Sequence, residues 1–250
     1  MSELRIIPVP LADEICPGDS LAQKILRALA GKHQKLRQGD ILIVKHKVVS
    51  KAEGRIVELS EMKPSAKTRA WARRYNLDPR VTQLALRESK RILRQEKGVL
   101  ITETGHGLVC ANSGVDVSNV DGGVCALLLP EYPDRSAAQL HRELKKRLQL
   151  SVPVIISDSF GRAWREGLTE VAIGVAGMKA LHDYRGRRDS HGYPLRVTME
   201  AVADELACAA GLVCGKLART PVCIVRGFEY HAGQGRGRDL IRPAKRDLFR

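Results

Sequence analysis

The distribution of short apolar runs constrains the fold of this chain more than any other feature. Seven strand-like runs are spread along the whole sequence: "LRIIPV", "ILIVKHKVV", "GVLITET", "VCALLL", "VPVIIS", "VAIGV" and "PVCIVRG". They are too widely separated for a sandwich of evenly spaced short strands, and helical patterns lie between many of them. The pattern therefore predicts a mixed α/β or α+β class built on a mixed sheet.

Four segments carry helical patterns. The first, residues 19–32, has Asp19 or Ser20 as its N-cap and Gly31 as its stop, and the second begins at Asp78-Pro79 and runs to Gly98. Residues 134–150 and 198–216 complete the set, and the last of these is apolar on most faces, which predicts a buried helix.

Length and composition allow a single globular enzyme and indicate a cytoplasmic protein. A chain of 250 residues can bury a large core, so we treat residues 1–250 as one functional unit with two possible subdomains and a basic tail over residues 231–250. It has no apolar run of 18 residues, its N-terminus carries acids, and its six cysteines never form CxxC. We expect a cytoplasmic protein with reduced thiols, without a membrane span.

The surplus of positive charge indicates an anionic ligand. Forty-two basic residues stand against 28 acidic ones, a formal charge of +14, which attracts phosphates, nucleic acid or polyacidic ligands. Aromatic residues make up only 4%, and no helix-turn-helix, zinc-finger or RNP pattern occurs, so nucleic-acid binding is the weaker alternative. The Gly- and Arg-rich tail is expected either to be an exposed arm or to wrap a partner subunit.

Two Asp-containing segments are candidates for a metal site. The run "VPVIIS" predicts a strand over residues 152–156, and Asp158 follows it, where ligands collect in open sheets. Asp116 lies in the Gly-rich loop "ANSGVDVSNVDGG", which does not match an EF-hand. A pair of carboxylates together with phosphates suits Mg²⁺ or Mn²⁺, while two independent Asx turns remain the alternative.

Further positions point to phosphate or substrate. Lys51 lies beside Gly54, and Gly215-Lys216 resembles a phosphate loop but fails the Walker pattern. Glu88, on an expected apolar helix stripe, needs a partner, which is either an ion pair elsewhere or a ligand, and His191 is a candidate ligand contact. These residues indicate a metal-assisted, phosphate-handling enzyme and no more.

Four longer segments carry a family resemblance. "VSKAEGRI", "HGLVCANSGVDVSNV", "SDSFGRAWREGLTEVAIGVAGMKALHDYRGRRDSHG" and "VADELACAAGLVCGKLARTPVCIVRG" together resemble the coenzyme F420:L-glutamate ligase family, the gamma-glutamyl ligases of the deazaflavin cofactor. The resemblance implies an α+β ligase fold distinct from Rossmann and P-loop folds, forming an intertwined homodimer. It also implies a GTP-dependent reaction that joins L-glutamate to the phospholactate carboxylate of the deazaflavin acceptor through an acyl-phosphate, followed in some cases by further gamma-linked glutamates.

The resemblance also assigns roles by position. Asp116 and Asp158 match divalent-metal ligands and Ser159 a second-metal ligand, which implies two Mg²⁺ or Mn²⁺ ions, with a monovalent cation such as K⁺ as a further option. The positions matched to the nucleotide are Ala12, Asp13, Glu14, Ile15, His46, Lys47, Lys51, Asn119, Cys214, Gly215, Lys216, Leu217, Ala218, Arg219, Thr220 and Pro221.

The remaining assignments rest on chemistry or depart from the family pattern. Arg162 and Arg165 are assigned to anionic substrate or to charge that develops on an acyl-phosphate, with two surface arginines as the alternative. Glu88 and His191 are candidates for substrate contact. His46-Lys47 stand where several members have Ser-Thr, and Lys216 where some have an acidic metal ligand, which leaves nucleotide choice and the second metal open. A different carboxylic acid acceptor is the other alternative.

Overall fold

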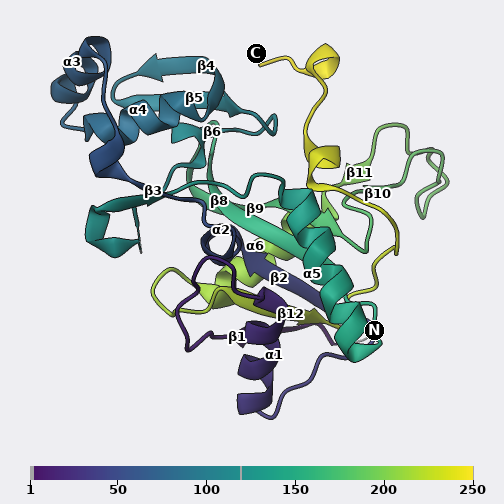
Figure 1. Ribbon diagram of the computed structural model, residues 1–250. Coiled ribbons are helices and arrows are strands. Elements are labelled where there is room, and N and C mark those ends of the chain that lie inside the picture. Colours follow the sequence, from purple (N-terminus) through teal and green to yellow (C-terminus); the bar gives the residue numbers. More distant parts are fainter. Residues whose placement is uncertain (1–2, 119, 250) are drawn as a thin grey trace.

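A five-stranded mixed sheet forms the centre of the computed structural model, which describes residues 3–118 and 120–249 (Figure 1). Its strands lie in the order β1-β12-β2-β8-β9. Only the β2–β8 pair is parallel, and every other neighbouring pair is antiparallel. The predicted mixed sheet is confirmed. The strands are β1 (Arg5–Val9), β2 (Ile41–Lys45), β8 (Val154–Arg162), β9 (Arg165–Ala176) and β12 (Val222–Arg226).

Helices cover both faces of this sheet (Figure 1). One face carries Ile41, Ile43 and Ile155, which pack on α6, and the other carries alternate residues such as Val44 and Ile156, which pack with α1 and α5. The period of two along a strand produces both apolar faces, and each fully buried Ile or Val contributes about 1.5–3 kcal/mol. The helices are α1 (Leu21–Gly31), α2 (His46–Ala52), α5 (Pro133–Leu148) and α6 (Val202–Cys214).

A smaller α+β region lies beyond one end of the sheet (Figure 1). It contains a two-stranded sheet, a three-stranded antiparallel sheet and two short helices around Leu59 and Leu84. Its elements are β3 (Ile56–Glu58), α3 (Ala66–Arg74), α4 (Pro79–Arg87), β4 (Ser89–Glu96), β5 (Val99–Thr104), β6 (Val109–Ala111) and β7 (Cys125–Leu127).

The prediction of one helix over residues 78–98 is wrong in its second half. The helix begins at the Asp78 cap as expected but ends at Arg87, and the chain then forms β4. Lys97 and Gly98 both have positive φ (50° and 78°) and join β4 to β5 by a two-residue turn. Such turns match the twist of an antiparallel hairpin, so pairing with β5 overrides the helical spacing of residues 89–96.

Two further boundaries differ from expectation. The run "ILIVKHKVV" forms a strand only as far as Lys45, and α2 begins at His46. Similarly, β8 does not end before Asp158 but continues to Arg162, because β9 pairs with it along its whole length. The predicted end of this strand at Ile156 is therefore wrong, and so is the alternative of an Asx turn at Asp158. Ser20 is confirmed as the cap of α1, since its side chain accepts a hydrogen bond from the Gln23 amide.

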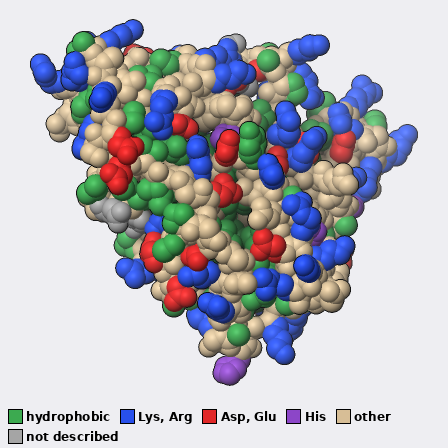
Figure 2. All heavy atoms as spheres, viewed as in Figure 1, with side chains coloured by type: hydrophobic (Ala, Val, Ile, Leu, Met, Phe, Trp, Pro, Cys, Tyr) green, Lys and Arg blue, Asp and Glu red, His purple; other side chains and the backbone are tan. Residues whose placement is uncertain are grey.

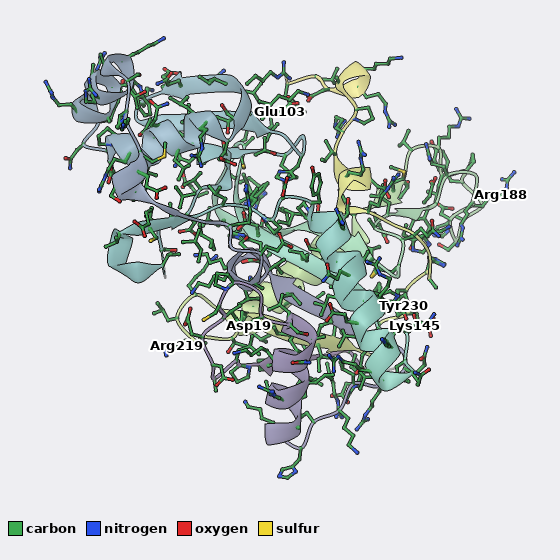
Figure 3. The ribbon with its side chains drawn as sticks, viewed as in Figure 1. Asp19, Glu103, Lys145, Arg188, Arg219 and Tyr230 are labelled. Atoms are coloured by element: carbon green, nitrogen blue, oxygen red, sulfur yellow. The ribbon has the colours of Figure 1, made fainter. Side chains whose placement is uncertain are left out.

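Two long connections lie beside the sheet. The first joins β10 (His182–Asp183) to β11 (Met199–Glu200), and Figure 3 places Arg188 at its outer end. The second is the basic tail, which is anchored where the Gly237 amide donates to Asp134 Oδ1 at 2.6 Å. A Cβ at Gly237 would lie 2.4 Å from the Ile173 carbonyl oxygen, so glycine is needed for this close approach. The tail therefore runs along its own chain.

No helix within the described residues is long and apolar enough to cross a bilayer.

Candidate active site

Three consecutive basic residues at the junction of β2 and α2 each contact a different carboxylate. The sequence is continuous, but the three acids come from β9, β8 and the loop after β6. The contacts are Lys45 Nζ to Glu170 Oε1 at 2.5 Å, His46 Nε2 to Asp158 Oδ1 at 3.2 Å, and Lys47 Nζ to Asp116 Oδ2 at 2.7 Å. The junction therefore brings together segments that are far apart in the chain.

The alternation of β8 explains why the acids lie on two sides of the sheet. Ser157 and Ser159 face the same side and both hydrogen-bond Glu170, which is paired with Ser159 in the β8–β9 register. Asp158 points to the opposite side, where it meets His46. Pairing between β2 and β8 ends at Lys45 and Ser157, so Asp158 lies just beyond the end of the parallel pair.

One carboxylate oxygen of Asp158 has close partners, and the other, which we call the open oxygen, has no hydrogen-bond donor among the described residues. Its Oδ1 accepts the Ser159 amide at 2.7 Å and faces His46. None of the described residues donates a hydrogen bond to Oδ2, although the side chain is only 14% exposed. Burial and the neighbouring Asp158 charge raise the pKa of Cys110 to about 12, so this thiol is neutral at physiological pH.

Asp116 is held in a tight loop. Its backbone forms an antiparallel bridge with Leu127, and its Oδ1 accepts the Ser118 amide at 2.6 Å. Burial raises the pKa of Asp116, but hydrogen bonds from Lys47 and Ser118 outweigh it, so the pKa is lowered overall and the carboxylate stays charged. The loop depends on Gly114, which has φ +72° and where a Cβ would lie 2.7 Å from Leu129.

Glu170 forms a second group on the other side of β8. We call Lys45, Ser157, Ser159, Glu170 and Lys216 the Glu170 cluster. Ser159 Oγ donates to Glu170 Oε1 at 2.8 Å, and Lys216 Nζ contacts both Ser159 Oγ and, at 3.5 Å, Glu170 Oε1. Burial raises the pKa of Glu170, but the contacts with Lys45, Ser159 and Lys216 lower it overall.

The structure brings several of the predicted nucleotide positions together. Lys51 lies one helical turn after Lys47 on α2 and pairs with Glu14. Lys24 contacts the same segment, through the Glu14 carbonyl at 3.3 Å and Asp13 at 3.8 Å. The loop from Ala12 to Ile15 therefore lies beside α2.

The predicted loop over residues 214–221 divides into buried and exposed parts. Cys214 is the buried last residue of α6, whereas Leu217 and Arg219 are exposed, and Figure 3 shows Arg219 on the loop that projects beyond the sheet. The Pro221 carbonyl accepts the Lys45 amide at 2.8 Å, which ties the loop to the junction. Asn119 lies outside the described residues.

Arg162, Arg165 and His191 lie away from the β2–α2 junction. Arg162 and Arg165 occupy the tip of the β8–β9 hairpin, where the Arg162 side chain donates to the carbonyls of Glu166 and Gly167 in β9. The tip is four residues past Asp158, about 13 Å along an extended strand. His191 is exposed and its amide caps an Asp189 turn.

The expected helix stripe for Glu88 is absent, because Glu88 caps the end of α4 rather than lying in a helix interior. Its carboxylate instead pairs with Arg55 and Arg87, each at 3.2 Å. Glu88 therefore has ion-pair partners, as the alternative expected, and its contact with substrate stays a prediction.

Asp116 and Asp158, on the α2 side of β8, are the carboxylates that could contribute to a Mg²⁺ or Mn²⁺ site. Among the described residues, no group of three or more His, Cys, Asp or Glu side chains could hold a metal by itself. Mg²⁺ is commonly bound by one or two carboxylates, with phosphates and water completing its shell. Asp116 and the open oxygen of Asp158 provide such a partial set, with Lys47 and His46 as their present partners.

Sequence reasoning missed Lys45, Glu170 and Cys110. The signal that could have revealed the first was the run Lys45-His46-Lys47 directly after a buried strand. Glu170 lies between polar and apolar residues of a long strand, and only the β8–β9 register shows that it faces Ser159. Cys110 gives no signal of its own, because its proximity to Asp158 and its raised pKa arise only in the folded protein.

Known proteins match this chain along nearly its whole length. A family model described as F420-0:Gamma-glutamyl ligase matches residues 11–227. The coenzyme F420:L-glutamate ligase of Methanopyrus kandleri is 44% identical over 99% of this chain and 98% of its own length. The enzymes of the same name from Methanocaldococcus jannaschii and Methanothermobacter thermautotrophicus are 44% and 43% identical, and they cover 86% and 93% of both chains.

These matches make the protein an enzyme of the ligase class. More specifically, the chain belongs to the coenzyme F420 gamma-glutamyl ligase family. The matched range contains the β2–α2 junction, Asp116, Asp158 and the Glu170 cluster.

Proposed function

We propose that this enzyme joins L-glutamate to the phospholactate carboxylate of a coenzyme F420 precursor, with GTP as the energy source. The acceptor carboxylate attacks the γ-phosphorus of GTP, which releases GDP and forms an acyl-phosphate. The glutamate amine then attacks the acyl carbon, loses a proton and displaces phosphate. The observation that carries the proposal is the β2–α2 junction, where three consecutive basic residues contact carboxylates from three distant segments. All of these residues lie within the region matched by the family model.

Phosphoryl transfer needs positioned positive charge more than covalent chemistry from the protein. Lys47 and Lys51 lie one turn apart on α2, so both ammonium groups can face the phosphates once Asp116 and Glu14 release them. The buried His46 side chain, which is 2% exposed, contacts Asp158 Oδ1 and fixes the orientation of this carboxylate. The segment from Ala12 to Ile15 is proposed to contact the base.

Asp116 and Asp158 would hold a Mg²⁺ or Mn²⁺ ion, which supplies charge neutralisation at the transferring phosphoryl group. Asp158 is prepared for this role because its backbone is fixed by β9 and one carboxylate oxygen is open. The pKa of Asp116 is lowered, so it stays ionised without the ion.

Arg162 and Arg165 are proposed to bind the anionic acceptor away from the phosphates. Their place at the hairpin tip, about 13 Å from Asp158 along the strand, suits an extended substrate better than the reacting carboxylate. We also propose that the enzyme acts as a homodimer.

Mass spectrometry of the acceptor tests this function. The enzyme is incubated with deazaflavin phospholactate, L-glutamate, Mn²⁺ and either GTP or ATP. We expect the acceptor to gain one glutamyl unit or a ladder of such units, with GTP only. Turnover with ATP alone would contradict the nucleotide assignment. If the deazaflavin compound is unchanged, the incubation is repeated with other carboxylic acids. GTP hydrolysis that depends on one of these acids would show that it, and not the deazaflavin compound, is the acceptor.

The surface charge gives the nucleic-acid alternative little support. Figure 2 shows Lys and Arg side chains scattered over the visible face with acidic side chains among them, rather than gathered into one stripe. A protein that follows a phosphate backbone presents a continuous basic track. We therefore propose that the positive charge on this face serves anionic small-molecule substrates and products.

A further inference from the structure

In the Glu170 cluster, two lysine ammonium groups already neutralise the carboxylate. Lys45 Nζ lies 2.5 Å from Glu170 Oε1, and Lys216 Nζ lies 3.5 Å from the same oxygen while contacting Ser159 Oγ. Two ammonium groups against one carboxylate leave a net charge of +1 within the cluster. Any further cation would meet repulsion rather than attraction.

The hydrogen bonds of the cluster leave little room for a metal. The Ser159 hydroxyl donates its one proton to Glu170 Oε1 and accepts from Lys216. Glu170 Oε1 therefore forms ion pairs with Lys45 and Lys216 and accepts a hydrogen bond from Ser159. Its Oε2 accepts a hydrogen bond from Ser157 at 3.4 Å. A divalent ion at Ser159 would have to displace an ammonium group that is already in place.

The surrounding backbone fixes this arrangement. Lys45 is held because its amide donates to the Pro221 carbonyl, at the end of the loop that carries Lys216. Gly211 of α6 packs directly on Glu170, since a Cβ there would lie 2.6 Å from Glu170 Cγ. Lys45 thus reaches Glu170 from the end of β2, and Lys216 reaches it from the loop between α6 and β12, whose last residue accepts the Lys45 amide.

We propose that the Lys45 and Lys216 ammonium groups occupy the place of a second cation beside Ser159, so that each active site binds a single divalent ion. The proposal rests on the proposed function, because that function puts the one ion at Asp116 and Asp158. Lys45 is 17% exposed and serves mainly to neutralise Glu170. Lys216 is 63% exposed, so its ammonium group can also meet a phosphate oxygen from solvent.

The test counts bound Mn²⁺ by electron paramagnetic resonance of the unbound ion. The full chain is titrated in the presence of a non-hydrolysable GTP analogue, and nucleotide binding is followed separately by calorimetry. We expect one Mn²⁺ per wild-type chain. Lys216→Glu replaces an ammonium with a carboxylate next to Ser159 and Glu170, and should raise the count to two. Lys67→Glu makes the same charge change at an exposed position on α3 and should leave it at one.

Each outcome bears on a different claim. Two Mn²⁺ ions per wild-type chain would overturn the proposal while leaving the ligase function intact. A count of one in a folded Lys216→Glu variant that still binds the nucleotide would also overturn it. No Mn²⁺ in the wild type, despite nucleotide binding, would overturn both this proposal and the metal assignment of the function. If Lys216→Glu fails to fold, the wild-type count still decides.

Discussion

Replacement of Glu170 by Gln should destabilise the fold at neutral pH. The glutamate side chain is 8% exposed and that of Lys45 is 17% exposed, so the pair is largely buried. Removing one charge of a buried pair costs about 3–5 kcal/mol, because the remaining charge loses its partner. Glutamine keeps hydrogen bonds to the two serines and Lys45 retains some solvent contact, so we expect a loss of about 2–3 kcal/mol.

Thermal unfolding by calorimetry measures this effect. For a chain of this size, 1 kcal/mol shifts Tm by about 2–4 °C, so Glu170→Gln should lower Tm by about 4–12 °C at pH 7. The matched control is Glu3→Gln, which removes an exposed partner of Arg5 and should leave Tm unchanged. A Glu170→Gln variant that unfolds with the wild type would refute the claim that this ion pair holds the cluster together.

The pH dependence of the free energy of unfolding provides a second test of the Glu170 ion pair. The contacts with Lys45, Ser159 and Lys216 lower the pKa of Glu170 in the folded protein from its ordinary value of 4.5. Its contribution to the free energy of unfolding is therefore fully present above about pH 4.5 and is lost as pH falls through the folded pKa. The gap between wild type and Glu170→Gln should be constant near neutral pH and should close on acidification below pH 4.5. A gap that widens instead would contradict the assigned direction.

Three further changes follow from the same geometry. Asp158→Asn should abolish glutamyl transfer while circular dichroism and Tm show an intact fold; turnover at the wild-type rate would contradict the metal role. Gly211→Ala places a Cβ 2.6 Å from Glu170 Cγ, and overpacking of about 1–3 kcal/mol against a helix gain of about 1 kcal/mol should lower the free energy of urea unfolding. Folded protein treated with iodoacetamide at pH 8 should be alkylated at exposed Cys16 and not at Cys110, whose pKa burial raises to about 12, as peptide mapping would show; equal labelling would contradict that burial.

Local sequence patterns were sufficient where one segment decides its own structure. Ser20 caps α1 as expected, and the apolar runs of β1, β2, β8 and β12 all lie in the mixed sheet. These predictions succeed because a cap or a buried strand depends mainly on neighbouring residues. The resemblance to the gamma-glutamyl ligases likewise rests on long ordered segments, and the comparisons confirm it.

The failures occur where distant segments decide. Residues 89–96 have helical spacing but form β4, because the turn at Lys97-Gly98 and pairing with β5 are more favourable. Asp158 looks like the end of a strand, yet β9 extends pairing to Arg162. No local pattern reveals that Lys216 reaches Ser159 and Glu170, since this contact needs α6 to be packed on the sheet.

Transfer of oxygen from the acceptor to phosphate tests the central claim most directly. The acceptor carboxylate is labelled with ¹⁸O, and the phosphate released during one turnover with GTP, L-glutamate and Mn²⁺ is analysed by mass spectrometry. If the acceptor carboxylate is converted to an acyl-phosphate beside Asp116 and Asp158, each released phosphate should carry one ¹⁸O atom. The Asp158→Asn variant should release no labelled phosphate. Amide product accompanied by phosphate without ¹⁸O would contradict the proposed mechanism.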